Sequence, residues 1–130
     1  MNKPKITMKV VKEDEGYSAT AKVGNEFIAT QGETFDELRE MIIEVVNLTF
    51  EDKRIAYSID EIGFEYDMPS FFSFYRVINS KALSKRIGMN QSLLAQYVNG
   101  IKKPSPRQAK KILAGVQKIG RELSEISFLL

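Results

Sequence analysis

The sequence predicts an α+β domain followed by an all-α domain, and three observations support this fold class. Within residues 1–68 apolar and polar side chains alternate in short runs, as in strands buried on one face. From residue 71 onwards apolar residues recur every three or four positions, which is the helical period. Residues 1–68 hold 8 Lys and Arg against 15 Asp and Glu, a net charge of −7, whereas residues 69–130 hold 11 against 2, a net charge of +9. We therefore expect two domains, 1–68 and 69–130, with different partners.

The first three predicted elements are strands of a meander. Ile6, Met8 and Val10 alternate with polar residues, and the same alternation returns over residues 17–22. A third run, residues 26–30, follows a tight Gly-Asn connection. Polar turns separate the runs, so we expect three neighbouring strands.

A helix and a fourth strand complete the first domain. Thr34 and Glu37 have the spacing of a capping box at a helix N-terminus. Apolar residues at intervals of three and four follow, which predicts an amphipathic helix over about residues 35–52, packed on one face of the sheet. Residues 62–68 predict a further strand, and Pro69 ends the domain. The predicted order is therefore β-β-β-α-β.

Four helices are predicted in the second domain. They cover about residues 71–78, 81–87 and 91–98, and a long helix runs from Pro106 towards the C-terminus. One tight turn separates the second helix from the third. Gly88 can adopt the positive φ that ends the second helix without steric cost.

This pair of short helices is typical of a device that reads the major groove of DNA. Leu83 points into the angle between the helices from one side and Leu94 from the other. Asn90 is placed to cap the second helix of the pair, whose first turn then presents Gln91 and Ser92 to solvent. Glutamine can make a bidentate contact to adenine, and serine can bond to several base edges. The alternative is an ordinary polar surface on a helix N-terminus.

The segment resembles the λ-repressor-like (XRE-type) helix-turn-helix family over about residues 71–115, the whole of that family's five-helix unit. The resemblance rests on Leu83-Ser84, Gly88-Met89-Asn90-Gln91-Ser92, Leu94, Asn99-Gly100 and Lys103-Pro104-Ser105. It implies base-reading roles on the second helix of the motif for Gln91, Ser92, Ala95 and Gln96. Candidate phosphate contacts around that helix are Lys81, Lys85, Asn99, Lys102 and Lys103. Ser84 stands where the family usually has alanine, and Val98 where glutamate is common.

The first domain is similar to the HicB antitoxin domain, a partial RNase H-like fold. The similarity covers about residues 5–68 and rests on the β-β-β-α-β order, on Gly16-Tyr17-Ser18-Ala19, and on residues 30–38 entering the helix. It implies an antitoxin of a type II toxin–antitoxin system. The acidic domain would block a small basic HicA-like toxin that cleaves RNA, and the basic domain would repress the operon by binding operator DNA. The chain departs from the family at residues 26–30, where a proline-glycine turn is usual.

Two other functions compete with this interpretation. A one-component transcriptional repressor would use the first domain to sense a small ligand, and it would need a pocket with convergent polar groups. A metal-dependent nuclease would need three or four carboxylates that converge on metal ions. The acidic residues fall instead in the turn 13–15 and on the outer face of the helix, whereas Met8 and Ala19 hold mid-strand positions. We therefore expect no enzyme.

Composition narrows the chemistry further. The sequence has no cysteine and no histidine, which excludes disulfides and removes the commonest metal ligand and general base. We expect no metal and no cofactor. No apolar run approaches the roughly 18 residues that span a bilayer, and the N-terminal segment lacks the apolar centre of a signal peptide. We therefore expect a cytoplasmic protein with no membrane partner.

A homodimer or a higher even oligomer is the expected assembly, because helix-turn-helix units bind twofold sites as dimers. The C-terminal segment, residues 119–130, ends in Ser127-Phe128-Leu129-Leu130, which is unusually apolar for a free terminus. We expect this segment to pack between subunits, and burial against its own domain is the alternative.

Overall fold

A computed structural model describes residues 3–130 of the chain. The chain divides into two compact units, Met1–Phe74 and Tyr75–Leu130, which are called the first and the second unit below. All the acidic residues except two belong to the first unit, so the two units keep the net charges of −7 and +9 found in the sequence.

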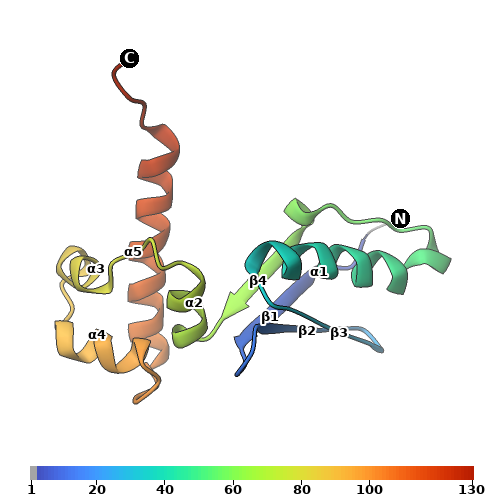
Figure 1. The fold of residues 1–130 in the computed structure, drawn as a ribbon, viewed down its shortest axis with the longest axis horizontal. Helices are drawn as coiled ribbons and strands as arrows, with labels where there is room; N and C mark the ends of the chain where they lie inside the picture. The colour runs from blue at the N-terminus through green and yellow to red at the C-terminus, as the bar shows by residue number, and fades with distance from the viewer. Residues whose placement is uncertain (1–2) are drawn as a thin grey trace. The chain divides into compact units, whose positions relative to one another are not determined.

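The first unit is built on a four-stranded sheet with the spatial order β3-β2-β1-β4 (Figure 1). The strands are β1 Ile6–Lys12, β2 Tyr17–Val23, β3 Glu26–Gly32 and β4 Ile62–Tyr66. The first three form the predicted meander with antiparallel pairing. β4 returns after a helix and pairs parallel to β1, with Ile6 opposite Ile62. The chain order β-β-β-α-β is therefore confirmed.

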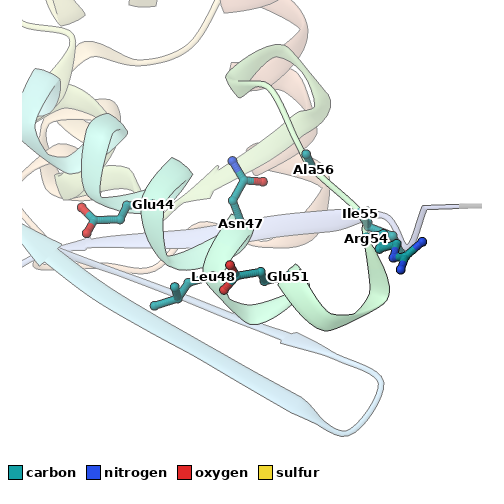
Figure 2. Close-up of a pocket in the computed structure, with 7 residues that line it drawn as sticks. All are labelled: Glu44, Asn47, Leu48, Glu51, Arg54, Ile55 and Ala56. Carbon is teal, nitrogen blue, oxygen red and sulfur yellow. The ribbon is translucent and has the colours of Figure 1, made fainter.

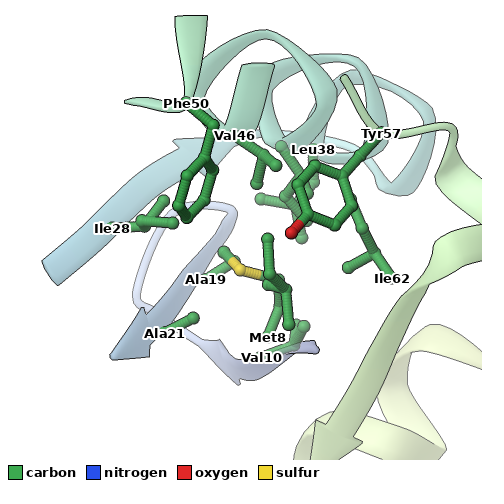
Figure 3. Packing of buried hydrophobic residues seen from close by; sticks show 12 residues of the cluster. Met8, Val10, Ala19, Ala21, Ile28, Leu38, Val46, Phe50, Tyr57 and Ile62 are labelled. Atoms are coloured by element: carbon green, nitrogen blue, oxygen red, sulfur yellow. The ribbon is translucent and has the colours of Figure 1, made fainter. Parts of the chain in front are cut away.

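Helix α1, Phe35–Thr49, covers one face of the sheet and closes the core of the first unit. Thr34 caps it, since its hydroxyl oxygen accepts a hydrogen bond of 3.1 Å from the Glu37 N–H. Buried residues at intervals of four, Leu38, Ile42 and Val46, form its inner face. Figure 3 shows Met8, Ala19 and Ile28 of three strands beneath them. Alternate strand residues point to the same face, so the apolar alternation in the sequence becomes this core.

Tyr57 fixes the connection from α1 to β4. Its N–H and C=O both bind the side-chain amide of Asn47, at 2.7 and 3.2 Å, and its hydroxyl donates to the Pro4 carbonyl at 2.6 Å. The Asn47 amide thus provides hydrogen-bond partners for the backbone N–H and C=O of Tyr57, which lies in an irregular segment without a neighbouring strand. α1 ends at Thr49 rather than near residue 52, because Glu51–Lys53 forms a separate 3-10 turn.

Helix α2, Met68–Phe74, belongs to the first unit, which corrects the predicted domain boundary and the predicted helix over 71–78. The buried Ser70 hydroxyl accepts a hydrogen bond of 2.8 Å from the Lys12 N–H in β1. The ring of Phe74 lies 4.0 Å from that of Tyr17, centroid to centroid. Helical spacing shows that a segment is a helix, but these contacts with distant strands determine to which unit it belongs.

The second unit contains three helices within its described residues: α3 Ser80–Ile87, α4 Gln91–Val98 and α5 Pro106–Glu125 (Figure 1). The prediction of one five-helix unit over residues 71–115 is therefore corrected, because the segment before α3 packs on the sheet of the first unit. The buried apolar residues of the second unit are Leu83, Met89, Leu94, Tyr97 and Ile112.

Across residues 3–130, no helix combines the length and the apolar content that a membrane crossing would need.

Candidate nucleic-acid interface

The turn between α3 and α4 is set by its end residues. Asn79 caps α3 by accepting a hydrogen bond of 3.0 Å from the Ala82 N–H. Gly88 ends α3 at φ 67°, in the left-handed region where a side chain is disfavoured. The N–H of Met89 then bonds back to the carbonyl of Ser84 at 2.9 Å. This is the tight, glycine-dependent turn that the sequence predicted.

Buried side chains hold the angle between the two short helices. Leu83 of α3 and Leu94 and Tyr97 of α4 are all buried, and Met89 fills the turn between them. Ser84 is also buried, and its hydroxyl donates to the Lys81 carbonyl at 2.6 Å. Because this polar group has a partner, a serine is accommodated where the family usually has alanine.

The first turn of α4 is exposed and capped. The side-chain oxygen of Asn90 accepts a hydrogen bond of 3.1 Å from the Leu93 N–H. Gln91 and Ser92 are exposed, as is Gln96, and Ala95 is half-buried. These positions are spaced one, four and five residues from Gln91, so the four predicted base-reading residues share one side of α4. Leu94 and Tyr97 turn to the interior.

The five predicted phosphate-binding residues are all exposed, but they come from three segments. Lys81 and Lys85 lie on α3, Asn99 is the C-cap of α4, and Lys102 and Lys103 lie in the connection to α5. The structure thus places the loop lysines directly after α4, at the end opposite Gln91 and Ser92.

The start of α5 adds cations that the sequence argument missed. Ser105 caps the helix by accepting a hydrogen bond of 3.2 Å from the Gln108 N–H. A hollow of about 620 Å³ is lined by Ser105, Arg107, Gln108, Lys110 and Lys111. The Lys111 ammonium also donates to the Gly88 carbonyl at 3.3 Å, which joins α5 to the turn of the motif.

A signal for these residues was present in the sequence. The positive end of the helix dipole lies at the N-terminus, where acidic residues are stabilising and basic residues are not. α5 nevertheless begins with no acidic residue in its first turn and with three basic residues in its first six positions. Such an unfavourable arrangement is explained if the cations face an anionic partner.

Arg86 of α3 forms an ion pair within the second unit. The Arg86 guanidinium makes two hydrogen bonds of 2.7 Å to the two carboxylate oxygens of Glu122 on α5. The hydrogen bonds from Arg86 hold the pKa of Glu122 below its usual value of 4.5. Both side chains are nearly half exposed, so the pair orients α3 and α5 more than it stabilises them.

The outer side of α1 forms an acidic surface on the first unit. The acidic α1 surface consists of exposed residues spaced by four and three, Glu37, Met41, Glu44, Leu48 and Glu51. Two shallow hollows lie along it. One, of about 420 Å³, is lined by Glu15, Gln31, Gly32, Glu33, Glu37 and Met41. The other, of about 570 Å³, is lined by Glu44, Asn47, Leu48, Glu51, Arg54, Ile55 and Ala56 (Figure 2).

The polar side chains of the second hollow are few. Asn47 is the neutral polar side chain of the second hollow, and its amide is already bonded to the backbone of Tyr57. Within residues 3–130, no group of three or more His, Cys, Asp or Glu is arranged to hold a metal ion. What remains is an exposed surface with acidic and apolar side chains.

A capped, exposed helix after a tight glycine turn, surrounded by cations, defines the class of helix-turn-helix DNA-binding modules. Comparison with known families agrees, because residues 78–117 match the family described as Helix-turn-helix. The match covers α3, α4 and the first part of α5, and it identifies the second unit as part of a sequence-specific DNA-binding regulator. Neither the curated proteins nor the solved structures gave a match to this chain.

Proposed function

We propose that this protein is an antitoxin that neutralises a small basic RNA-cleaving toxin through its first unit and represses its own operon through its second. The observation that carries the proposal is the acidic α1 surface, with two exposed apolar residues in it, on a chain that also contains a helix-turn-helix. The acidic first unit suits a basic protein partner, and the basic second unit suits DNA, which is negatively charged.

For the DNA step, α4 enters the major groove with its N-terminal end towards the bases. Gln91 then bonds to an adenine edge and Ser92 to a neighbouring base, while Gln96 lies one turn further on. Lysines of α3 and of the α4–α5 connection neutralise phosphates on both sides, and Arg107 and Lys110 of α5 add to them. Two copies bind a twofold operator, with half-sites about one helical turn apart.

For the toxin step, the first unit is a HicB-like, partial RNase H-like domain and its partner a HicA-like protein. Carboxylates of the acidic α1 surface attract the basic partner and orient it, and Met41 and Leu48 supply the apolar contacts. The unit acts by binding and not by catalysis. Met8 and Ala19, at positions where a nuclease would anchor metal ligands, are buried under α1.

Copurification tests this function. The tagged full chain is expressed together with the open reading frames that flank its gene, and the captured complex is identified by mass spectrometry. We expect one small basic protein in stoichiometric amount, which cleaves RNA after release from the complex and not within it. Absence of such a protein, or a released partner without RNA cleavage, contradicts the antitoxin role.

Matched variants connect the result to the two units. Glu44→Lys combined with Glu51→Lys should abolish capture of the partner, because it reverses two charges of the acidic α1 surface. Gln91→Ala should retain the partner and lose operator binding. An operator affinity of the pure chain that changes with a small metabolite would favour the ligand-sensing repressor instead.

A further inference from the structure

One face of the sheet in the first unit is accessible to solvent. α1 packs on the opposite face, above Met8, Ala19 and Ile28 (Figure 3). Because strand residues alternate between the two faces, the residues between these core positions point away from α1. They form what we call the open sheet face: Thr7, Lys9, Thr20, Lys22, Phe27, Ala29 and Gly63. The two threonines are half-buried and the other five residues are exposed.

Phe27 is the large apolar residue of the open sheet face. Its side chain is 69% exposed, and within residues 3–130 its ring contacts no other ring and no cation. A phenylalanine stabilises a fold through burial, so this ring contributes little to the first unit. Lys22 of β2 lies directly opposite Phe27 in the register of the sheet. An exposed ring beside a cation suits a single-stranded nucleic acid, whose bases stack on rings and whose phosphates pair with cations.

The charge of the open sheet face also suits a polyanion. Lys9 lies opposite Thr20, and Lys22 is two residues further along β2, so the two lysines are diagonal neighbours. Neither lysine forms an ion pair within residues 3–130, although Glu65 of β4 lies opposite Lys9. The acidic α1 surface is separated from these lysines by the thickness of a helix, about 10 Å. This exceeds the Debye length of about 8 Å at physiological salt, so its carboxylates are largely screened there.

Gly63 keeps the open sheet face shallow at β4. Glycine within a strand weakens it, and it often marks a place where a ligand approaches the backbone. A Cβ on Gly63 would lie 3.5 Å from the Thr7 hydroxyl oxygen, which is an ordinary contact, and its φ is not positive. The fold of the first unit therefore does not require glycine here. Close approach of a ligand to the backbone of β4 is a reason for it.

We propose that the open sheet face binds single-stranded RNA. A base stacks on Phe27, and neighbouring phosphates pair with Lys9 and Lys22. The hydroxyls of Thr7 and Thr20 bond to 2′-OH groups, which DNA lacks. A duplex keeps its bases stacked inside and offers none to Phe27, so this face does not bind double-stranded DNA. The proposed activity goes beyond toxin binding on the acidic α1 surface and operator binding by α4.

A single fluorophore tests the proposal in the full chain, because the sequence contains no tryptophan. Oligouridine should quench the fluorescence of Phe27→Trp, since a base stacked on an indole quenches it. The matched control is Leu48→Trp, which places the same fluorophore on α1 of the same unit at a residue that is 66% exposed. This control should not be quenched. The position of the fluorophore is decisive because the basic second unit also attracts RNA.

Reversing charge shows whether the lysines hold the RNA. In the Phe27→Trp chain, Lys9→Glu combined with Lys22→Glu should abolish the quenching. Oligothymidine should quench Phe27→Trp only at higher concentration, because it lacks the 2′-OH. Absence of quenching in Phe27→Trp, equal quenching of Leu48→Trp, or quenching that survives the charge reversal overturns the proposal. Equal affinity for oligothymidine overturns the assignment to RNA.

Photochemical cross-linking keeps the test decisive if the tryptophan variants fail to fold. Oligouridine that carries photoreactive thiouridine is cross-linked to the original chain, and mass spectrometry locates the attachment. We expect cross-links in β1 to β3, and a loss of about ten-fold in Phe27→Ala. Cross-links confined to residues 75–130 overturn the proposal. Unchanged cross-linking of Phe27→Ala with loss of the copurified partner would assign the face to a protein and also overturn it. Neither quenching nor cross-linking uses operator or toxin, so their failure leaves the proposed function standing.

Discussion

Single side chains on α4 carry the recognition step of the proposed regulator. Gln91 is exposed at the first position of the helix, where its amide is free of the packing that holds Leu94 and Tyr97. A bidentate contact of this kind contributes about 1–3 kcal/mol of discrimination between bases. Its loss should therefore change both affinity and selectivity.

Gln91→Ala is expected to weaken binding at the cognate operator by about 1–3 kcal/mol and to relax the preference at the contacted base. Fluorescence anisotropy with the operator and with single-base variants measures both effects. Gln117→Ala, an exposed glutamine of α5, is the control and should bind like the original chain. If Gln91→Ala binds the cognate operator as tightly as the original chain does, Gln91 does not belong to the interface.

Gly88→Ala should destabilise the second unit by about 1–2 kcal/mol, because a Cβ at φ 67° approaches the following carbonyl. No atom within 4 Å opposes the methyl group, so the cost is one of backbone conformation and not of packing. Urea unfolding followed by circular dichroism gives the free energy of unfolding. A variant as stable as the original chain would show that the turn tolerates a side chain.

At the scale of elements, the segments next to α4 add basic side chains to the proposed DNA-binding surface. The connection after α4 and the first turns of α5 bring Lys102, Lys103, Arg107 and Lys110 into one stretch of nine residues. A phosphate contact contributes to affinity for every DNA sequence and sets the salt dependence. Measuring affinity for several DNA sequences and at several salt concentrations therefore distinguishes phosphate-binding residues from base-reading residues.

Lys103→Ala and Arg107→Ala should each weaken binding to operator and random DNA alike. Each should lower the slope of log affinity against log salt by about 1, since one phosphate contact is lost. Titrations at several salt concentrations measure the slope. Lys22→Ala, an exposed lysine of β2, should leave it unchanged. If a variant loses affinity for the operator but not for random DNA, its side chain instead takes part in base recognition.

The N-terminal segment and the turn before β4 are joined by an exposed ion pair. The Lys3 ammonium lies 2.7 Å from a Glu61 carboxylate oxygen, and the Ser58 N–H donates to the other oxygen at 2.9 Å. These hydrogen bonds, that from Lys3 foremost, lower the pKa of Glu61 from 4.5 to about 2. A lowered pKa in the folded state stabilises the fold at pH values above the unfolded pKa.

Glu61→Gln should therefore lower Tm of the first unit most at pH values above 4.5, and the difference from the original chain should shrink as the pH falls from 4.5 towards 2. Thermal unfolding at a series of pH values measures it. The effect should be small and should weaken in high salt, because both partners are exposed. A difference that grows on acidification would contradict this assignment.

The whole molecule joins two units of opposite charge, and this determines how salt acts on it. Binding of the basic unit to DNA releases counterions, and the proposed docking on the acidic α1 surface would depend on attraction to a basic partner. Raising ionic strength from 50 to 200 mM should weaken DNA binding by about 10³-fold or more if about six phosphates are contacted. A salt-independent affinity would contradict an interface built on the cations of α3 and α5.

Local patterns in the sequence determined the elements of both units. The alternation at Ile6, Met8 and Val10 and the capping threonine at Thr34 are properties of a few adjacent residues, and the structure has strands and a helix there. Gly88 and Asn90 define their turn in the same way, through a positive φ and a side-chain cap. Such features can be predicted from the sequence because the residues that cause them lie within one turn or one strand.

Tertiary structure alone decided the placement of α2, the parallel return of β4 and which apolar residues of α5 are buried. The hydrogen bond from the Lys12 N–H to Ser70 joins residues 58 positions apart, and no local pattern encodes such a pairing. Ile112 and Leu123 occupy the same repeat, yet Ile112 is buried and Leu123 is 60% exposed, because the fold packs apolar side chains against α5 at Ile112 and not at Leu123. Periodicity shows which residues share a face, but burial depends on what the rest of the fold brings against that face.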